Sequence, residues 1–564
     1  MKSRWIAYFF LFGFVSLGFA CKGGGDGGGD FLEVVGTGPS DGEQDVPVAV
    51  VLGFRVADPI DPATLTADSF FVTDPDGDVM PGAVRVLEDE DTAAALVLEA
   101  PLTILTEYTV TVTTALESTR GKRLEQDFQW TFQTIDAEWG EAEWIEPEGL
   151  GNSAGTEIGV ADDLSALAVW RIEDSTGEAI FANRYTRTDL WGEPEPIDDG
   201  MGALGNPELA VSGTGDGFAV WTRTVGSERN IWTNRYDAET GAWGTPMLLQ
   251  TGEVTRASDP VIAADPEGNA TAIWVQDNLD TGREIIRAIR YDAVSGWGSA
   301  VTIASPSTFV AAGRTGVGMD DEGGAIAVWD PPAGGPGDGF RVIMASRYVP
   351  GGNWSPPVAV KSDESTSADN FRIDVGANGD AVVVWEQGNG DDLAPRDDIW
   401  ASRFSSTGWS SPERIDNYDG GDKMLPDVGV DGAGNAYAVW AQVDPDFANI
   451  WAAPYAAGSG WTAPELIEPP SENPSDDGDA IAPRVDVNRA GNVFVVWRQV
   501  WDQWGSIWSN RRDPGTPWMT AELVEGFPST ANAPTIAVDE ARHAHAVWQH
   551  DVTGGTSVRS SRFE

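Results

Sequence analysis

The sequence predicts an all-β protein in which an Ig-like β-sandwich precedes a β-propeller. Two observations lead to this prediction. Short alternating strands separated by turn residues fill residues 31–134, and a fifteen-residue module that ends in Trp occurs eight times after residue 137. The chain has 564 residues, 41% of them hydrophobic, and 25 Trp. It is therefore long and apolar enough to form large packed cores.

The net charge excludes one class of partner. The chain carries 89 acidic and 35 basic residues, a formal net charge of -54. Phosphate backbones and anionic membrane surfaces repel such a chain, so no nucleic-acid binding is expected. The acidity fits either solubility at a cell surface or adaptation to salt. In both cases moderate salt or Ca²⁺ should raise the melting temperature by screening or bridging carboxylates.

The N-terminus has the features of a secretory signal over residues 1–20. Lys2 and Arg4 precede an apolar run that ends at Phe19, and Cys21, the single cysteine of the chain, follows. Leu17 to Cys21 resembles a bacterial lipoprotein signal, although Leu17 lies four residues before the cysteine and not three. The resemblance implies lipidation of Cys21, whereas cleavage after Ala20 by ordinary signal peptidase is the alternative.

Residues 21–30 then form a Gly-rich tether, so membrane contact is expected only through the lipid. The expected location is the cell envelope, as an outer-membrane lipoprotein that is surface-exposed or periplasmic.

The first domain, residues 31–134, contains alternating apolar segments at the spacing of a sandwich. The expected strands are Val48–Val56, Phe70–Thr73, Val84–Leu87, Ala94–Leu98, Tyr108–Thr113 and Phe128–Gln133. Several motifs here resemble the bacterial Ig-like domain of S-layer and outer-membrane proteins. They are Pro39-Ser40-Asp41-Gly42, Val46-Pro47, Phe54, Asp61-Pro62, Tyr108 to Val112 and Trp130 to Thr134. The resemblance implies a stalk or spacer without catalysis.

Asp74, Asp76 and Asp78 alternate as the first ligands of a calcium loop do. The later Glu of an EF-hand is missing, and Asp-Gly between two strands is also an ordinary hairpin turn. The turn is the preferred interpretation, so no cofactor is expected, with Ca²⁺ as the alternative at this loop.

Residues 137–564 are repeats. The module, which occupies Pro426–Trp440 in its sixth copy, ends at Trp residues spaced 51 to 57 apart, namely Trp170, Trp221, Trp274, Trp329, Trp385, Trp440, Trp497 and Trp548. Each module predicts a hairpin, and the two runs that follow it, such as Ile399–Phe404 and Trp409–Ile415, predict a third and a fourth strand. Two and four residues before each Trp the chain is mostly Ala, and the intervening positions often hold larger apolar residues. Both faces of each four-stranded antiparallel sheet therefore need a neighbour.

The ends of the repeat region predict eight blades and a ring in which strands from both ends of the chain complete one sheet. A fourth-strand motif, Trp139–Pro147, precedes the first module, and the last repeat stops after a third strand at Val558–Phe563. Pairing of the N-terminal outer strand with the C-terminal three strands would close the ring and remove exposed sheet edges.

Variable loops predict the functional rim. The loops between second and third strands and between blades vary most, and both lie on one rim of a propeller. Trp501 and Trp504 belong to no repeated Trp column. With Asp502 and Gln503 they suit a neutral glycan or a polar peptide. The two Trp side chains could instead pack over the mouth of the propeller's central channel. An acidic rim is expected to disfavour sialylated or sulfated chains unless Ca²⁺ bridges them.

His543 and His545 are a candidate metal pair, although His545 occupies a column that is apolar elsewhere and so fits a core position. The repeats also loosely resemble sialidase-like and lectin-like propellers, although the Ser-x-Asp-x-Gly-x-Thr-Trp box of sialidases is replaced by Asp-x-x-Gly-Asn. A sialidase-like hydrolase needs a nucleophilic Tyr, and Tyr418 is the candidate. No Walker loop, Ser-His-Asp motif or His-Glu-x-x-His is present.

The sequence therefore favours a non-catalytic, surface-anchored binding protein, expected to be a monomer, which presents the propeller to a glycan or a protein. The alternatives are a sialidase-like glycoside hydrolase and a structural scaffold of the envelope.

Overall fold

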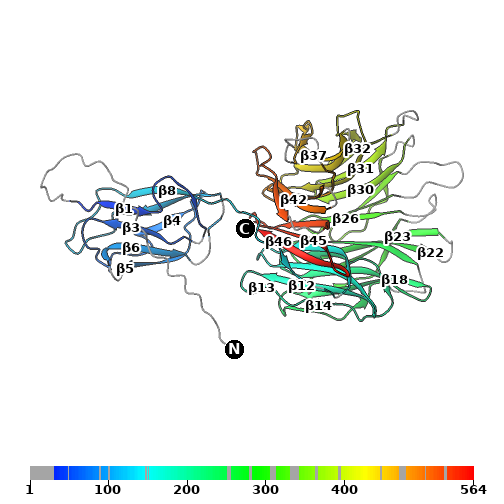
Figure 1. The fold of residues 1–564 in the computed structure, drawn as a ribbon, viewed down its shortest axis with the longest axis horizontal. Coiled ribbons are helices and arrows are strands. Elements are labelled where there is room, and N and C mark those ends of the chain that lie inside the picture. Colours follow the sequence, from blue (N-terminus) through cyan, green and yellow to red (C-terminus); the bar gives the residue numbers. More distant parts are fainter. Residues whose placement is uncertain are drawn as a thin grey trace. The chain divides into compact units, whose positions relative to one another are not determined.

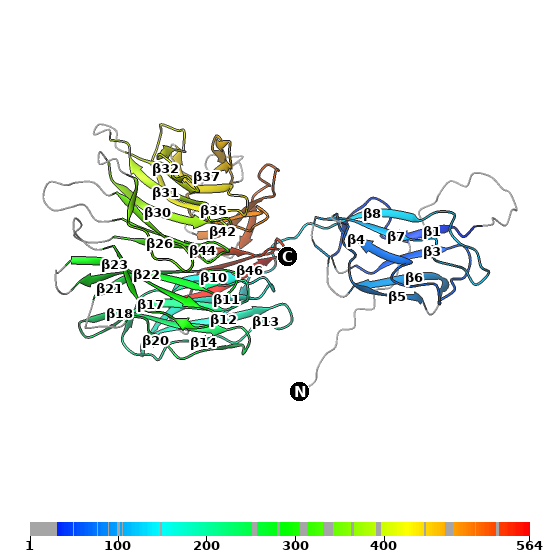
Figure 2. The same cartoon turned by 180° about the vertical axis from the view of Figure 1, so that it is seen from behind.

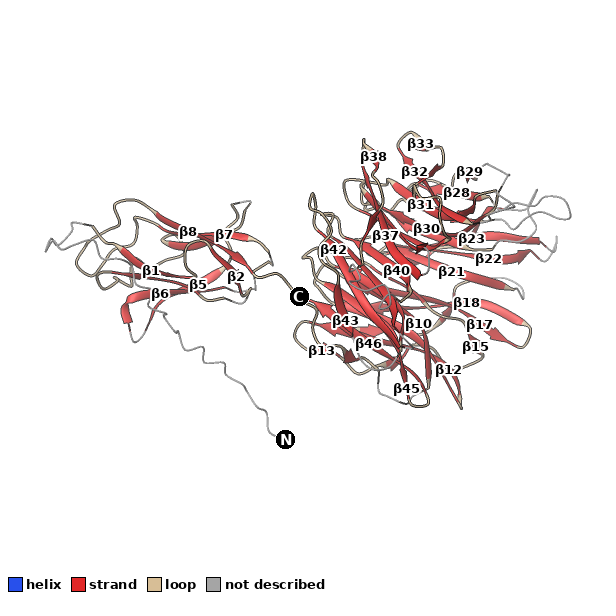
Figure 3. Ribbon diagram, turned by 45° about the horizontal axis from the view of Figure 1, so that its top comes forward, coloured by secondary structure: helices blue, strands red, loops and turns tan. Residues whose placement is uncertain are grey.

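The fold is all-β. The computed structural model describes residues 31–48, 50–75, 77–87, 90–98, 102–103, 105–146, 149, 151–250, 256–278, 283–304, 313–330, 342–361, 366–390, 396–444, 447–468, 478–501, 504–525 and 530–564. Strands and loops make up these residues, without a helix (Figure 3). It follows that no helix in this part of the chain could span a membrane. The chain divides into two compact units, one ending at Asp136 and one beginning at Ala137 (Figure 1).

The first unit is a sandwich of two four-stranded sheets. Its strands are β1 (Val34–Gly38), β2 (Glu43–Val46), β3 (Leu52–Val56), β4 (Phe70–Thr73), β5 (Gly82–Leu87), β6 (Glu90–Leu98), β7 (Glu107–Val112) and β8 (Phe128–Thr134). The sheet orders are β1-β3-β6-β5 and β2-β8-β7-β4. Phe54, Phe70 and Trp130 lie in its buried core, with the first two rings in edge contact at 4.8 Å. The six expected strands are present, and β1 and β2 were missed because they are short and polar or Gly-rich.

The second unit repeats a sheet of the same design. Its first strands, one in each repeat, are β10 (Asn152–Val160), β16 (Glu208–Val211), β21 (Ala257–Ala264), β26 (Thr315–Met319), β30 (Ala368–Val375), β35 (Lys423–Val430), β40 (Ala480–Val487) and β44 (Ala531–Val538). The second strands, which contain the module Trp, are β11 (Ala166–Asp174), β17 (Gly217–Val225), β22 (Ala270–Asn278), β27 (Ala325–Trp329), β31 (Ala381–Gly388), β36 (Ala436–Asp444), β41 (Val493–Trp501) and β45 (Ala544–Val552).

The third strands are β12 (Gly177–Thr186), β18 (Glu228–Asp237), β23 (Arg283–Asp292), β28 (Ile343–Tyr348), β32 (Asp397–Ser405), β37 (Phe447–Ala456), β42 (Trp504–Arg512) and β46 (Gly555–Phe563). Outer edges are formed by short strands: β9 (Glu143–Trp144), β13 (Leu190–Trp191), β14 (Glu195–Pro196), β19 (Ala242–Trp243), β20 (Met247–Leu248), β24 (Gly296–Trp297), β25 (Val301–Ala304), β29 (Val358–Lys361), β33 (Gly408–Trp409), β34 (Glu413–Arg414), β38 (Gly460–Trp461), β39 (Glu465–Leu466) and β43 (Glu522–Glu525). One further short strand, β15 (Ala203–Leu204), pairs with β17.

Apolar cores are shared between neighbouring sheets. Trp440 of the sixth repeat lies in one core with Val384 of the fifth, and Trp497 of the seventh lies in one core with Val439 of the sixth. The eight module Trp residues are each at most 3% exposed. As the alternation of small and large residues predicts, each sheet buries both faces against its neighbours.

The first strands contact one another in order along the repeats, and β44 also contacts β10. The two ends of the unit meet here, since β9 pairs with β46 and Trp139 lies opposite Phe563. Ile158 of the first repeat and Val547 of the last share one core. Figure 2 shows β46 beside β10 and β11.

Replacing Phe563 by Ala should destabilise the second unit. The Phe563 ring is fully buried, and its centroid lies 5.8 Å from that of Trp139 and 5.1 Å from that of Phe494. Truncation of a buried Phe costs about 3–5 kcal/mol. Urea unfolding followed by Trp fluorescence should show this loss. Val294→Ala, at a residue that is 97% exposed, is the control. Equal stability of the two variants would show that the terminal strand contributes nothing.

Candidate functional site

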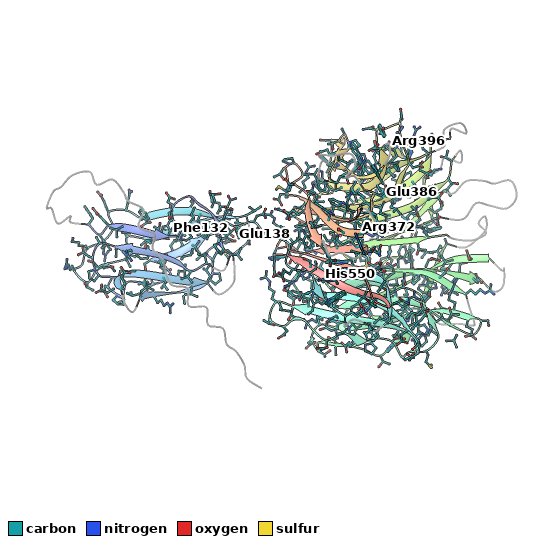
Figure 4. The ribbon with its side chains drawn as sticks, in the orientation of Figure 1. Phe132, Glu138, Arg372, Glu386, Arg396 and His550 are labelled. Carbon is teal, nitrogen blue, oxygen red and sulfur yellow. The ribbon has the colours of Figure 1, made fainter. Side chains whose placement is uncertain are left out.

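A polar pocket lies where the first strands converge. Its volume is about 400 Å³, and all eight repeats line it. Its polar side chains are Glu157, Glu208, Asp259, Arg314, Thr315, Arg372, Asp427, Arg484 and Thr535. Figure 4 labels Arg372, which comes from β30 in the middle of the second unit. The pocket therefore gathers charged groups that are far apart in the sequence.

A β-bulge shapes most of these first strands. Six of them shift register just before the pocket residue, for example between Asp369 and Arg372 and between Ile481 and Arg484. Each of the six has one residue with a left-handed backbone: Gly155, Asp259, Asn370, Leu425, Ala482 and Ala533. Bulges bend a strand and redirect its side chains, and non-glycine residues rarely adopt positive φ. The repeated bulge therefore directs the side chains that follow it into the pocket.

The acidic and basic groups of the pocket come from different repeats, and Asp427 is the one carboxylate among the arginines. Glu157, Glu208 and Asp259 come from the first three repeats. Arginines come from the fourth, fifth and seventh repeats, namely Arg314, Arg372 and Arg484. Asp427 of the sixth repeat lies between them, with its Oδ1 4.0 Å from Nε of Arg372. The pocket is therefore bipolar, although the chain as a whole is strongly acidic.

Burial makes the pocket carboxylates difficult to ionise. Burial raises the pKa of Glu157, and the neighbouring Glu208 carboxylate raises it further. Burial also raises the pKa of Glu208, while the charges of Arg372 and Arg484 lower it. The guanidiniums therefore act on the glutamates electrostatically within the same pocket.

Two further carboxylates connect adjacent first strands. Asp374 Oδ2 accepts a hydrogen bond of 2.7 Å from the Val430 amide, and Asp486 Oδ2 accepts one of 2.7 Å from the Val538 amide. Burial raises the pKa of Asp374 to about 6 and that of Asp486 to about 7. These groups have a structural role, because each satisfies a backbone amide of the next repeat.

An ion-pair network bridges the other ends of the first strands. Arg489 lies in the turn after β40. Its guanidinium nitrogens form ion pairs with three carboxylates, at 3.1 Å from Asp321 Oδ2, 3.5 Å from Glu540 Oε1 and 3.9 Å from Asp162 Oδ1. These partners belong to turns of the fourth, eighth and first repeats. A smaller cavity of about 170 Å³ lies among these turns. The larger, bipolar pocket is therefore the better candidate for ligand binding.

The predicted Trp501–Trp504 site lies at a hairpin on the same edge of the unit as the pocket. Trp501 ends β41 and pairs with Trp504, which begins β42 and is 43% exposed. β40 begins at Ala480, opposite Gln499, so the hairpin extends beyond the strand that supplies Arg484. Asp502 and Gln503 lie outside the described residues.

Tyr418 lies in the connection from β34 to β35 and is not among the residues that line the pocket. It is 43% exposed. The nearby carboxylates are engaged elsewhere: Asp416 accepts from the Ile399 amide at 2.7 Å and pairs with Arg414 at 2.6 Å. The buried Lys423 ammonium donates to Asp398 at 3.1 Å and to the Tyr418 carbonyl at 2.7 Å. Tyr418 therefore lies near the Lys423 ammonium, and the carboxylates of Asp416 and Asp398 form contacts with other groups of the same loop region.

The two candidate metal ligands His543 and His545 have different surroundings. The Nδ1 atom of His543 lies 2.9 Å from Asp539, and its Nε2 lies 3.1 Å from Arg187. His543 takes the place in its turn that Asn435 takes in the sixth repeat. Burial, with the charge of Arg562, lowers the pKa of His545 to about 3, and its ring lies against Tyr185.

The candidate calcium loop is a turn in the structure. The Asp74 side chain accepts from the Asp78 amide at 2.9 Å, and the Asp74 carbonyl accepts from the Gly77 amide. Asp76 and Cys21 lie outside the described residues. Within the described ranges, no group of three or more acidic, His or Cys side chains is placed to hold a metal ion.

Comparisons with known proteins bear on the fold. Residues 30–134 match the model of the bacterial Ig-like domain family, which confirms the resemblance of the first unit. Bacterial surface proteins contain this domain. No curated protein matches the chain.

The chain is similar to several solved structures. An ulvan lyase of a polysaccharide lyase family is 12% identical, with 63% of this chain and 93% of that chain covered and a TM-score of 0.42. A leech intramolecular trans-sialidase is 10% identical, with 95% and 91% covered and a TM-score of 0.31. The β-propeller domain of the trilobed protease from Pyrococcus furiosus is 9% identical, with 70% and 97% covered and a TM-score of 0.37. The likeness concerns the fold and carries no argument about the ligand.

Replacing Glu208 by Gln should stabilise the protein at alkaline pH. A carboxyl group whose pKa is raised in the folded state contributes stability at low pH, and this contribution is lost as pH rises. Above about pH 5 the wild type should therefore become less stable relative to Glu208→Gln. Melting temperatures from pH 5 to pH 9 measure the difference. The exposed Glu195→Gln is the control. A Glu208→Gln variant that is less stable at pH 9 would contradict the assigned environment.

Proposed function

We propose that the protein is a non-catalytic binding protein anchored in the cell envelope, which holds a glycan or a polar peptide at the centre of its repeat unit. The observation that carries this proposal is the bipolar pocket. Its charged groups come from separate repeats, and bulges with left-handed residues precede most of them. Strained residues and carboxylates that are costly to ionise reduce stability, and proteins retain such features mostly at functional sites.

We further propose that the eight repeats form a closed eight-bladed propeller. The core shared by the first and last repeats and the pairing of β9 with β46 support this architecture. Closure would fix the distances between pocket groups, because each first strand is then held on both sides. A rigid site of this kind orients its ligand without a large loss of conformational entropy.

The segments before residue 137 fit the role of a spacer between the membrane and the repeats. We propose that Cys21 is lipidated and that residues 22–30 form a flexible tether. The bacterial Ig-like domain would then serve as a stalk between the membrane and the repeats. Each part before residue 137 extends the binding unit away from the membrane.

The hairpin at Trp501 and Trp504 is proposed as an outer part of the binding surface. An indole face suits the C–H face of a sugar ring or an apolar side chain, and Trp504 is partly exposed. The hairpin and the pocket occupy the same edge of the unit, so one extended ligand could contact both.

The double substitution Trp501→Ala and Trp504→Ala should weaken ligand binding and leave unfolding almost unchanged. The measurement is binding of the mature chain to a glycan array and a peptide array, with thermal unfolding in parallel. Val225→Ala is the matched control, because exposed Val225 ends the equivalent strand of the second repeat. A double variant that loses stability and keeps its ligand would show that the two Trp are packing residues.

The same samples test the alternative of a glycoside hydrolase. A sialoside and a panel of aryl glycosides should remain intact. Turnover that Tyr418→Phe abolishes would contradict the proposed non-catalytic role.

Cys21→Ser should release the protein from the membrane. Without the thiol no lipid can be attached, and the remaining chain carries a large negative charge that anionic membranes repel. Expression in a bacterial host with a radiolabelled fatty acid, followed by membrane fractionation, measures the effect. Label and membrane association that persist in the variant would contradict lipidation at this residue.

A further inference from the structure

The sorting of charge in the pocket points to the chemistry of its ligand. We infer that the pocket binds a zwitterionic group, with Arg372 and Arg484 holding its anionic end and Glu157 and Glu208 holding its ammonium. This inference rests on the proposed binding function and specifies the part of the ligand that enters the pocket. The ligand would be a small molecule or terminal group with an amine and an acid a few bonds apart.

The arginines supply the anionic half of the site. Arg372 Nη1 donates to its neighbouring Phe371 carbonyl at 3.2 Å, and Arg484 Nη1 donates to the Pro483 carbonyl at 3.1 Å. A guanidinium has five N–H donors, so these contacts use a minority of them. Asp427 Oδ1 forms an ion pair with Arg372, 4.0 Å from its Nε, without a hydrogen bond. Both guanidiniums therefore keep N–H donors that can bind a ligand carboxylate through charge-assisted hydrogen bonds.

The glutamates select against a ligand that is only anionic. Glu157 and Glu208 repel each other, and Asp259 adds a third negative group on the same side. A purely anionic ligand would meet this repulsion. An ammonium between Glu157 and Glu208 would relieve it and compensate their desolvation.

A neutral sugar alone fits the pocket less well. It would displace water from several charged groups without supplying an opposite charge, which leaves their desolvation uncompensated. The volume of about 400 Å³ is at the small end of ligand sites, enough for a compact group. Size and charge together therefore favour one zwitterionic group.

A series of ω-amino acids tests the inference. The probes are β-alanine, γ-aminobutyrate, δ-aminovalerate and ε-aminocaproate, each with its N-acetyl and its carboxamide derivative. Titration calorimetry with the mature chain should show at least one amino acid that binds about tenfold more tightly than both of its derivatives. The double variant Arg372→Gln and Arg484→Gln should no longer prefer the amino acid over its carboxamide. The double variant Glu157→Gln and Glu208→Gln should no longer prefer the amino acid over its N-acetyl form.

Arg489→Gln, at the other end of the first strands, is the matched control and should leave both preferences unchanged. Thermal unfolding of each variant establishes that it is folded. Equal affinity for an amino acid and its N-acetyl form, or no binding in the series, would overturn the inference. If array ligands still bind under those conditions, the proposed function stands and only the zwitterionic assignment fails. Absence of binding to the arrays as well would reject both.

Discussion

Burial of the module Trp between adjacent sheets is the constraint on which the second unit depends. The sheet of each repeat is apolar on both faces, so it cannot be stable beside water. Trp440 and Trp497 illustrate the solution, because each lies in a core shared with the preceding repeat. Once every sheet is packed in this way, the first strands must lie side by side around a centre. The pocket is a geometric consequence of the packing.

The repeats keep the packing residues nearly constant and vary the residues at the centre. The position thirteen residues before the module Trp is Glu157, Glu208, Arg372, Asp427 or Arg484 in five repeats. Bulges with left-handed residues support this position in most repeats. Stability thus comes from the repeated Trp and aliphatic residues, and chemical identity comes from side chains that differ between repeats. This division allows a charged site to form within a scaffold of repeated buried residues.

The repeated strands and the buried Trp could be predicted because alternation and spacing are visible along the chain. The pocket could not, since its members lie on separate strands and no single residue type is common to all of them. The bulge could not be predicted from the sequence either, because the residue with the left-handed backbone is Gly155, Asn370 or Leu425 in different repeats. Net charge suggested that the rim would disfavour anionic sugars unless Ca²⁺ bridges them, whereas the fold collects three arginines in one pocket. His545 illustrates the opposite case, since its apolar column in other repeats indicated a packed position.

A crystal structure of the mature chain with a bound array ligand or amino acid would show directly whether the convergence of the first strands creates the binding site. We expect ligand density in the central pocket, within hydrogen-bond distance of Arg372 and Arg484. Density confined to the outer strands, with the pocket filled by water alone, would contradict it.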